Sequence, residues 1–444
     1  MPNPYLPTWE YIPDGEPHVF GERVYVYGSH DNAGSDKFCD YKLKVWSAPV
    51  DDLTHWTCHG HIFHTKPDRD HTSDTDWTHD NDLYAPDVVE KDGKYYLYAY
   101  IMGTRGCVAV SEKPEGPFQL LSKYEFHPED KKYIDRYEEG WFIDPGVLVD
   151  DDGQVYIYCG YEHSFAAKIN ADNMYEIIDG SYTPDIIPAE EPFGFFEACS
   201  PRKIGDTYYL IYSPKIGSRL DYATSKSPLG PFNYRGTIVD NGVDYPGGND
   251  HGSICQINGQ WYIFYHRMTN CTVMSRRGCV EKIEILPDGT IPQVEMTSLG
   301  FDDALSPYEQ TKAELACVLK GGCFVNERNI FTRMVSGITS GCVIGYKYFD
   351  FGEDFVSKTM KFAVKVTGTG CKSAIHLRLD EPENGEEIGI CEIGMDSNVY
   401  QSVVKKVIGR HALYFVVEGM SGGWFKEMFE GRHLFELEEF VFLK

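Results

Sequence analysis

The chain has 444 residues and a formal net charge of −27, and 42% of its residues are hydrophobic and 14% aromatic. So negative a chain is repelled by nucleic acid and by anionic membranes, which argues against both as partners. The length predicts two domains, and the hydrophobic fraction is sufficient for packed cores.

The first residues, Met-Pro-Asn-Pro, show neither the basic nor the apolar segment of a secretion signal. No stretch has the roughly 18 consecutive apolar residues that a membrane span requires. The 13 cysteines are scattered singly, without a Cys-x-x-Cys pair, which is typical of reduced thiols in a cytosolic protein. We therefore predict a cytoplasmic protein.

Five short hairpin patterns recur in the first three hundred residues. Each has alternating apolar and aromatic positions around a turn rich in Gly, Asp and Asn, which is typical of antiparallel strands. They are residues 17–29, 86–100, 145–160, 200–213 and 252–266. A later pattern, SEKPEGPFQ at 111–119, returns almost unchanged as SKSPLGPFN at 225–233. A four-stranded unit that repeats about every 50 residues predicts a five-bladed β-propeller over residues 1–300.

The pattern changes after about residue 296. Residues 301–444 contain short alternating strands without the blade motif, for example at 342–351, 359–366 and 411–419. Regularly spaced strands of this kind predict a β-sandwich. The expected fold class is therefore all-β, with a five-bladed β-propeller followed by a β-sandwich.

Acidic residues recur where the inner strands of the blades are expected to begin. They are Asp14 with Glu16, Asp87, Asp144 and Glu197, followed by His251 at the same place in the fifth blade. Because the inner strands of all blades begin around one mouth of the central channel, we expect these side chains to meet there. Taken singly, Asp14, Glu16 and Asp144 also fit ordinary turns, and Asp87 is expected to have a supporting role. Glu197, in the apolar context PFGFFEACSPR, is harder to explain structurally.

Gathered carboxylates cost free energy, so their convergence indicates a chemical role. An inverting glycoside hydrolase needs a carboxylate base that activates water and a carboxylic acid that protonates the leaving oxygen, roughly 6.5–9.5 Å apart. A neighbouring carboxylate raises the pKa of the acid, which keeps it protonated near neutral pH. Three acidic groups can thus serve as base, acid and modulator of the acid's pKa.

Four motifs at blade spacing resemble glycoside hydrolase family 43 over residues 1 to about 300. They are NPYLPTWEYIPDGEPHVF, WFIDPGVLVDDDG, FFEACSPRKIGDTYYLIYS and GGNDHGSICQ. The resemblance implies Asp14 as the base, Asp144 as the modulator and Glu197 as the acid. The family usually has Asp directly before Pro in the first motif, whereas here Glu16 precedes Pro17. Glu16 is therefore the alternative base, although the shorter side chain of Asp14 leaves more room for water.

The resemblance also implies residues that bind the substrate and an ion. Arg276 in SRRGCVEKIEI is preferred to Arg277 as the arginine that contacts the sugar, and His251 is expected on the channel axis. There it would contact the substrate and a structural Ca²⁺, while the chemistry itself requires no cofactor. The other residues that we assign to substrate binding are Glu16, Asp87 and three aromatic residues that would form a sugar platform, Trp77, Tyr84 and Phe196. Trp9 is a further candidate, and each aromatic ring is equally compatible with the core.

The C-terminal region resembles a carbohydrate-binding module of family 6. Its segments GRHALYFVVEG and HLFELEEFVF match the last two strands of that module, and Tyr400 and Trp424 are candidates for its cleft. Two roles are open for this domain. It can complete the wall of the active site, or it can act as a structural buttress, which we favour.

The carboxylate pattern and the resemblance to family 43 and the module together imply an inverting, exo-acting enzyme, and the two resemblances imply that it releases α-L-arabinofuranosyl residues from arabinoxylan-derived oligosaccharides. A β-D-xylosidase or a bifunctional enzyme is the first alternative, because arabinofuranose and xylopyranose present similar hydroxyl groups. A propeller that binds carbohydrate without catalysis is a second. An endo-acting arabinanase is a third, but the long loop at 64–84 argues against the open groove that it needs.

Overall fold

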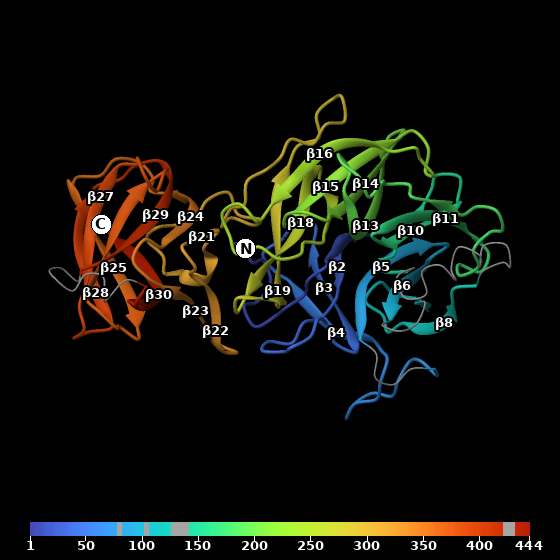
Figure 1. The fold of residues 1–444 in the computed structure, drawn as a ribbon, viewed down its shortest axis with the longest axis horizontal. Coiled ribbons are helices and arrows are strands. Elements are labelled where there is room, and N and C mark those ends of the chain that lie inside the picture. Colours follow the sequence, from blue (N-terminus) through green and yellow to red (C-terminus); the bar gives the residue numbers. More distant parts are fainter. Residues whose placement is uncertain (78–81, 102–105, 126–141, 421–430) are drawn as a thin grey trace.

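The computed structural model describes residues 1–77, 82–101, 106–125, 142–420 and 431–444, which form seven β-sheets (Figure 1). Five sheets follow one another in the first part of the chain, and two more form the second part. The all-β prediction is confirmed. No helix within the described ranges is long and apolar enough to cross a membrane.

Each of the first four sheets is a four-stranded antiparallel blade in chain order. The first contains β1 (Glu16–Phe20), β2 (Arg23–Gly28), β3 (Lys42–Pro49) and β4 (Thr57–His64), and the second β5 (Leu83–Lys91), β6 (Lys94–Ile101), β7 (Cys107–Ser111) and β8 (Gln119–Lys123). The third contains β9 (Gly146–Val149), β10 (Val155–Tyr161), β11 (His163–Ile169) and β12 (Thr183–Pro184), and the fourth β13 (Phe195–Ile204), β14 (Thr207–Pro214), β15 (Arg219–Ser225) and β16 (Asn233–Asp240). The five predicted hairpins supply the first two strands of the five blades.

The fifth blade differs from the predicted four-stranded unit, because its described strands are β17 (Ser253–Ile257), β18 (Gln260–Thr269) and β19 (Thr272–Ile283). The N-terminal segment runs along the free edge of β19. The side chain of Asn3 exchanges hydrogen bonds with the backbone of Val280, and the Tyr5 amide donates to the carbonyl of Gly278 at 3.3 Å. The beginning of the chain therefore takes the place of the missing outer strand.

The apolar core of the propeller is divided among the junctions between neighbouring blades. The first and second blades share a cluster that includes Leu43 and Leu97, and the first and fifth share one that includes Val26 and Phe264. The inner strands β1 and β17 also lie in contact, so the first and last blades are neighbours. This arrangement follows from the period of two in each strand, which gives every blade two apolar faces to bury.

A close approach between inner strands explains Gly146 in the segment Ile-Asp-Pro-Gly. A Cβ atom at this position would lie 2.2 Å from the carbonyl oxygen of Cys199. Only glycine allows β9 to lie this close to β13, and this contact brings the residues before β9 next to those at the start of β13.

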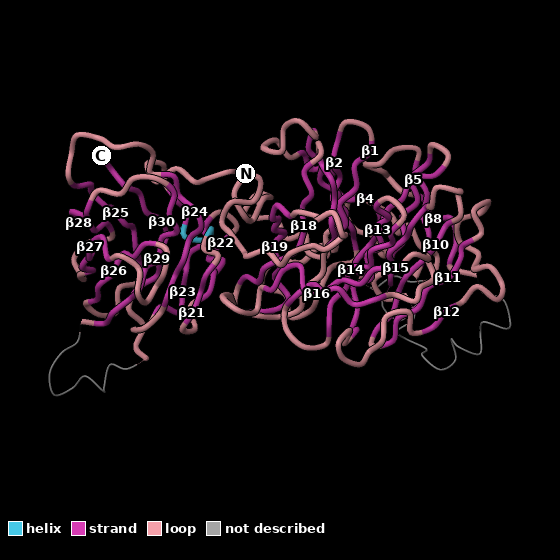
Figure 2. Tube along the Cα trace, turned by 90° about the horizontal axis from the view of Figure 1, so that it is seen from above, coloured by secondary structure: helices cyan, strands magenta, loops and turns pink. Residues whose placement is uncertain are grey.

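The C-terminal part is a sandwich of two sheets that lies beside the propeller in both views (Figures 1 and 2). One sheet has the order β22-β23-β30-β25-β28 with β20 paired to β30, and the other the order β21-β24-β29-β26-β27. The bounds are β20 (Thr311–Lys312), a 3₁₀ turn at Ala313–Leu315, β21 (Val318–Lys320), β22 (Phe324–Asn329), β23 (Thr332–Ile338), β24 (Val343–Asp350), β25 (Thr359–Thr367), β26 (Ser373–Leu379), β27 (Glu387–Ile393), β28 (Val399–Lys405), β29 (Arg410–Gly419) and β30 (Phe435–Leu443).

The sandwich and the propeller share one apolar core. A single cluster runs from Tyr265 in the fifth blade through Leu299 to Tyr346 and Phe415 in the sandwich. The predicted boundary between residues 300 and 301 falls in the connection from β19 to β20. Tyr400 packs against the edge of this cluster, and Trp424 lies outside the described residues.

Candidate active site

Acidic side chains meet where the inner strands begin, as the repeat predicts. Asp14 and Asp144 lie two residues before β1 and β9, and Glu197 lies at a bulge near the start of β13. Asp14, Asp144 and Ala198 have φ angles of 57°, 51° and 68°. Such left-handed backbone costs roughly 1–3 kcal/mol per residue and is common at functional sites, where the fold has to turn a side chain away from the strand direction.

Asp14 is buried, with 4% of its surface exposed, and both of its carboxylate oxygens accept hydrogen bonds. Arg276 Nη1 donates to Oδ1 at 2.7 Å, and the Ser29 hydroxyl donates to Oδ2 at 2.6 Å. Burial alone would raise the pKa of Asp14, but Arg276, His251, His266 and the Ser29 hydroxyl together lower it. Asp14 is therefore an ionised carboxylate at neutral pH.

Arg276 is held in place by a second carboxylate, that of Asp31. Its Nε and Nη2 atoms donate to the two oxygens of Asp31 at 2.9 and 3.0 Å, a bidentate pair that fixes the plane of the guanidinium. Arg277 points instead toward the sandwich, where its Nη2 donates to the carbonyl of Glu314 at 3.4 Å. The choice of Arg276 over Arg277 thus agrees with the geometry, but Arg276 is 2% exposed and its described contacts are with protein groups.

Asp144 lies between the other acidic residues. Its Oδ2 accepts a hydrogen bond of 3.1 Å from the backbone amide of Ala198, the residue after Glu197. His251 Nδ1 lies 3.7 Å from Asp144 Oδ2 and 3.9 Å from Asp14 Oδ1, so this ring bridges the two carboxyl groups. Burial raises the pKa of Asp144 well above its usual value, and the charges of Glu197 and Asp14 raise it further.

Glu197 is the most accessible of the three acidic residues, since it is partly exposed whereas Asp14 and Asp144 are buried. Burial raises the pKa of Glu197, and so does the charge of Asp14; Arg276 opposes them, and the resulting pKa is about 7. The site thus places an ionised carboxylate and a protonated carboxyl group side by side, the combination that acid–base hydrolysis requires.

Glu16 and Asp87 belong to a separate buried network with Arg202 and His18. Arg202 Nη2 donates to Glu16 Oε2 at 2.9 Å, and the Ser200 hydroxyl donates to the same oxygen at 3.1 Å. Asp87 Oδ1 lies 2.7 Å from His18 Nε2. Glu16 and Asp87 are 2% and 0% exposed, and their substrate-binding roles stay predictions.

The predicted aromatic platform is only partly assembled. Tyr84 lies near Arg276 and packs on Tyr100 with ring centres 5.9 Å apart, and Phe196 packs on Tyr161 at 4.8 Å. Trp77 is placed elsewhere, because it packs on the core between the first two blades and its ring lies 4.1 Å from the Lys123 ammonium. The position of Trp77 in a loop of the sequence did not predict these contacts.

Several residues of the site were not singled out in the sequence. Ser29 and Asp31 follow β2 in the segment Gly-Ser-His-Asp, where alternate positions point to the same side. This alternation, just beyond a predicted strand, is the feature of the sequence that could have identified Ser29 and Asp31 as site residues. His266 lies within β18, with its Nδ1 3.6 Å from Asp14 Oδ1, and only the folded structure reveals that contact.

A structural calcium ion beside His251 needs several oxygen ligands. In the described ranges no group of three or more His, Cys, Asp and Glu side chains with converging ligand atoms includes His251, whereas Glu16, His18 and Asp87 form such a group. The guanidinium of Arg202 already adds a positive charge 2.9 Å from Glu16. These residues fit a directly coordinated calcium ion poorly, so an ion beside His251 would depend on water ligands. The calcium ion stays a prediction.

A five-bladed propeller that gathers an ionised carboxylate and a carboxyl group of raised pKa has the acid–base pair that glycoside hydrolysis requires. The model of the family described as glycosyl hydrolases family 43 matches residues 7–291. The chain therefore belongs to glycosyl hydrolase family 43, and it is a glycoside hydrolase. That match ends before the sandwich, so the resemblance of residues 301–444 to a carbohydrate-binding module stays a prediction.

Individual relatives agree with this family. A protein named xylosidase/arabinosidase from Thermoclostridium stercorarium is 37% identical over an alignment 479 residues long. The alignment covers 94% of this chain and 96% of the relative. A β-xylosidase/α-arabinofuranosidase from a compost metagenome, solved with xylotriose, has a TM-score of 0.55 and 28% identity over 66% of this chain and 99% of that chain. A family 43 arabinoxylan arabinofuranohydrolase from Bacillus subtilis, solved with cellotetraose, has a TM-score of 0.56 over 100% of this chain and 97% of that chain. At 22% identity this last structure supports the fold alone.

Proposed function

We propose that the enzyme is an inverting, exo-acting α-L-arabinofuranosidase that acts on arabinoxylan-derived oligosaccharides. The observation that carries the mechanism is the contrast between Asp14, whose pKa is lowered, and Glu197, whose pKa is raised to about 7. Asp14 takes a proton from a water molecule, which attacks the anomeric carbon as the glycosidic bond breaks. Glu197 gives its proton to the departing oxygen. Water thus supplies the hydroxyl of the released sugar, and its proton on Asp14 returns to Glu197 through solvent.

Three neighbours support these roles. Arg276 keeps Asp14 ionised and fixes its orientation, since Arg276 itself is clamped by Asp31. Asp144 lies against the backbone that carries Glu197, and its negative charge, when present, favours the protonated form of the acid. His251 bridges Asp144 and Asp14 and separates their charges. Roles in sugar binding for Tyr84, Phe196, His251 and Arg276 are part of this proposal.

Asp14 is preferred to Glu16 as the base for an electrostatic reason. Burial and the charge of Asp87 raise the pKa of Glu16 to about 7 although Arg202 is adjacent, so a large share of Glu16 is protonated at neutral pH. A base has to be ionised at the pH at which it takes the proton from water, and the lowered pKa of Asp14 meets this condition. Glu16 Oε2 accepts hydrogen bonds from Arg202 and Ser200, so Glu16 belongs to a different charge network from Asp14, although its Oε1 has no hydrogen-bond partner in the described structure.

The substrate is tested by comparing turnover of p-nitrophenyl α-L-arabinofuranoside with that of the β-D-xyloside, followed by arabinoxylan oligosaccharides. We expect the arabinofuranoside to be preferred and arabinose to be the released monosaccharide. A β-xylosidase or bifunctional enzyme is the second candidate, because two of the relatives carry both activities in their names. Preference for the xyloside would support that candidate. No turnover of either substrate would support a binding propeller, and oligomeric products from linear arabinan an endo-acting enzyme.

The rate is expected to fall above pH 7. Glu197 acts as an acid only when protonated, and its pKa is about 7, so kcat/KM should drop toward tenfold per pH unit above that value. Asp14 acts as a base only when ionised, and its lowered pKa puts the acidic limb below the usual range of an aspartate. A pH–rate profile with an unactivated oligosaccharide checks both limbs. A rate that still rises between pH 7 and 9 would contradict the acid assignment.

The sandwich braces the segment that carries Asp14. Tyr11, three residues before Asp14, donates its hydroxyl hydrogen to Glu327 and accepts hydrogen bonds of 3.3 Å from the Nε and Nη2 atoms of Arg333. The carbonyl of Tyr11 in turn accepts from the amide of Asp31, the residue that holds Arg276. These contacts favour the buttress role for the sandwich.

The variant Tyr11→Phe is expected to lower the free energy of unfolding by about 1–3 kcal/mol, because it leaves buried charged partners without that hydroxyl. We also expect kcat to fall severalfold, since the brace ends at Asp14 and Asp31. Urea unfolding and steady-state kinetics measure the two effects. The matched control is Tyr400→Phe, because the hydroxyl of Tyr400 lies in an exposed turn near Ser397. Equal stability and kcat for the two variants would contradict the brace.

We also propose a cytoplasmic location, with short oligosaccharides as the substrates that reach the enzyme. All 13 cysteines are free thiols, and most are buried. This agrees with a reducing compartment. Cell fractionation with an antibody against the native protein tests it, and enzyme found outside the cell would contradict the proposal.

A further inference from the structure

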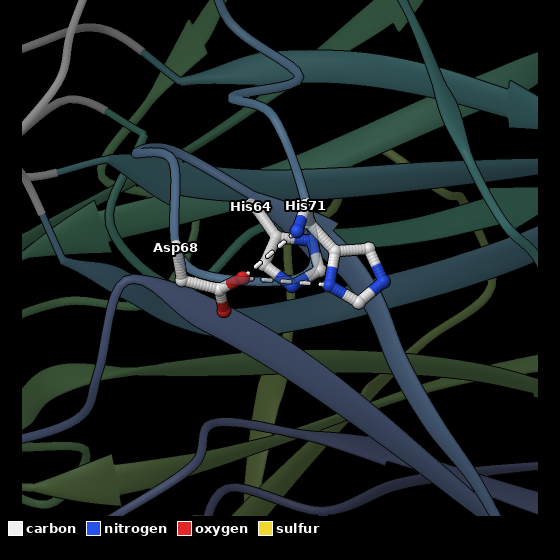
Figure 3. A group of neighbouring side chains, drawn as sticks. All are labelled: His64, Asp68 and His71. Carbon is white, nitrogen blue, oxygen red and sulfur yellow. Dashed lines mark hydrogen bonds and ion pairs between the residues drawn. The ribbon is translucent and has the colours of Figure 1, made fainter.

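We propose that His64, Asp68 and His71 form a binding site for a divalent transition-metal ion of the Zn²⁺ type, separate from the active site. One ligand atom from each of these residues lies within 4.8 Å of the others. Figure 3 shows the two imidazole rings stacked beside the Asp68 carboxylate. All three belong to the end of β4 and the start of the loop from the first blade to the second.

His64 is buried, and one of its ring nitrogens is available to a ligand. Its side chain is 3% exposed, and its Nδ1 lies 3.5 Å from Asp74 Oδ2. Its other ring nitrogen, Nε2, is buried and has no hydrogen-bond partner in the described structure. A histidine that binds a metal commonly directs its second nitrogen to a carboxylate in this way, which fixes the ring and its tautomer. A buried polar atom without a partner requires an explanation, and a bound ion supplies one.

The second histidine and the carboxylate are also held in place. The ring of His71 stacks on that of His64 with centres 4.4 Å apart and an angle of 19°, and its Nδ1 lies 3.6 Å from Asp68 Oδ1. Asp68 Oδ1 accepts hydrogen bonds from the backbone amides of Asp70 and His71, both at 2.9 Å. The Tyr41 hydroxyl donates a hydrogen bond to Asp68 Oδ2 at 3.2 Å. The ligand set is therefore positioned by a tight turn before any ion arrives.

A third imidazole makes simple packing a poor explanation. The ring of His61 lies 5.5 Å from that of His64, and its Nε2 is likewise buried without a hydrogen-bond partner among the described atoms. Two neighbouring rings, His61 and His64, thus each have a buried nitrogen without a hydrogen-bond partner in the described structure, which ring packing alone leaves unexplained. Two imidazoles and one carboxylate are a typical donor set for Zn²⁺ and its neighbours, whereas Ca²⁺ and Mg²⁺ prefer oxygen donors.

An ion at this site would fasten the loop to the first blade. His64 ends a strand of the blade, whereas Asp68, His71 and Asp74 lie in the loop, so coordination would link the two directly. Tyr41, which holds Asp68, is two residues from Cys39, whose sulfur accepts a hydrogen bond of 3.5 Å from Arg276 Nη2. The ion is thus expected to stabilise the wall next to the active site without taking part in the chemistry.

The test uses the full chain, stripped with a chelator and dialysed, and titrated with ZnCl₂ by calorimetry, with metal analysis of the dialysed complex. We expect about one equivalent of Zn²⁺ to bind, a rise in the unfolding temperature, and visible absorption typical of tetrahedral coordination when Co²⁺ replaces Zn²⁺. CaCl₂ at the same concentration should not compete. Absence of Zn²⁺ binding, or displacement of Zn²⁺ by Ca²⁺, would overturn the proposal.

Variants locate the site. His71→Ala and Asp68→Asn change side chains near the surface and should abolish the bound equivalent, whereas Asp74→Asn, which acts through His64, should weaken binding about 10–100-fold. His411→Ala is the matched control, because His411 lies in the sandwich and pairs with Asp380. Binding that survives in both His71→Ala and Asp68→Asn would overturn the site. Circular dichroism of each variant separates loss of the ligand from loss of the fold, and none of these results depends on glycosidase activity.

Discussion

The variant Glu197→Gln is expected to lower kcat on arabinoxylan oligosaccharides by about 10²–10⁴-fold, because it removes the proton that the leaving oxygen needs. The loss should be much smaller for a substrate such as a p-nitrophenyl glycoside, whose leaving group departs without protonation. The decline above pH 7 should also disappear, since Glu197 is the group whose pKa of about 7 produces it. Steady-state kinetics on both substrates across pH measures all three effects.

The matched control is Glu162→Gln. Glu162 is exposed, and it pairs with Lys215 on the propeller surface near Phe196. It therefore undergoes the same chemical change without contact to the reacting groups, and its kinetics should stay within about twofold of the unmodified enzyme. If Glu197→Gln loses the same factor on activated and unactivated substrates, Glu197 does not act as the acid. If it retains full activity on both, the propeller does not use this residue for hydrolysis.

The fold was predictable because its signals are local. Each blade begins with a hairpin whose alternation and turn lie within about fifteen residues, and local patterns of this kind specify strand pairing directly. The repeat then placed Asp14, Asp144 and Glu197 at equivalent positions, so their meeting followed from symmetry rather than from any contact visible in the sequence. The three-stranded fifth blade was not predictable, because its edge is covered by Asn3 and Tyr5 from the other end of the chain.

The electrostatic environment of the site was less predictable, because its partners are distant in the sequence. The clamp of Asp31 on Arg276 joins residues 245 positions apart, and the pairing of Glu16 with Arg202 joins residues 186 apart. Composition and spacing carry no information on such pairs, yet these pairs decide which carboxylate is free to react. Trp77 illustrates the same limit, since an aromatic residue in a loop can cover a core as readily as a ligand.

These long-range pairs separate the two candidate bases by experiment. Asp14→Asn is expected to reduce kcat by about 10²–10⁴-fold, on activated and unactivated substrates alike, because water has to be deprotonated in both reactions. Asparagine keeps the oxygen that accepts from Arg276, so the fold should persist. Glu16→Gln is the matched variant. It should lower stability, because Arg202 keeps an acceptor oxygen but loses the charge of its buried partner, and change kcat by less than tenfold.

Azide distinguishes a missing base from a displaced arginine. It is a nucleophile that needs no deprotonation, so it should restore turnover of the p-nitrophenyl glycoside by Asp14→Asn and leave a glycosyl azide of inverted configuration, readable by proton NMR. If Asp14→Asn failed only because Arg276 had moved, azide would restore nothing, since the sugar site itself would be altered. Rescue of Glu16→Gln and not of Asp14→Asn would assign the base to Glu16. Because the two carboxylates sit in different networks, one with Arg276 and one with Arg202, a single variant cannot disable both.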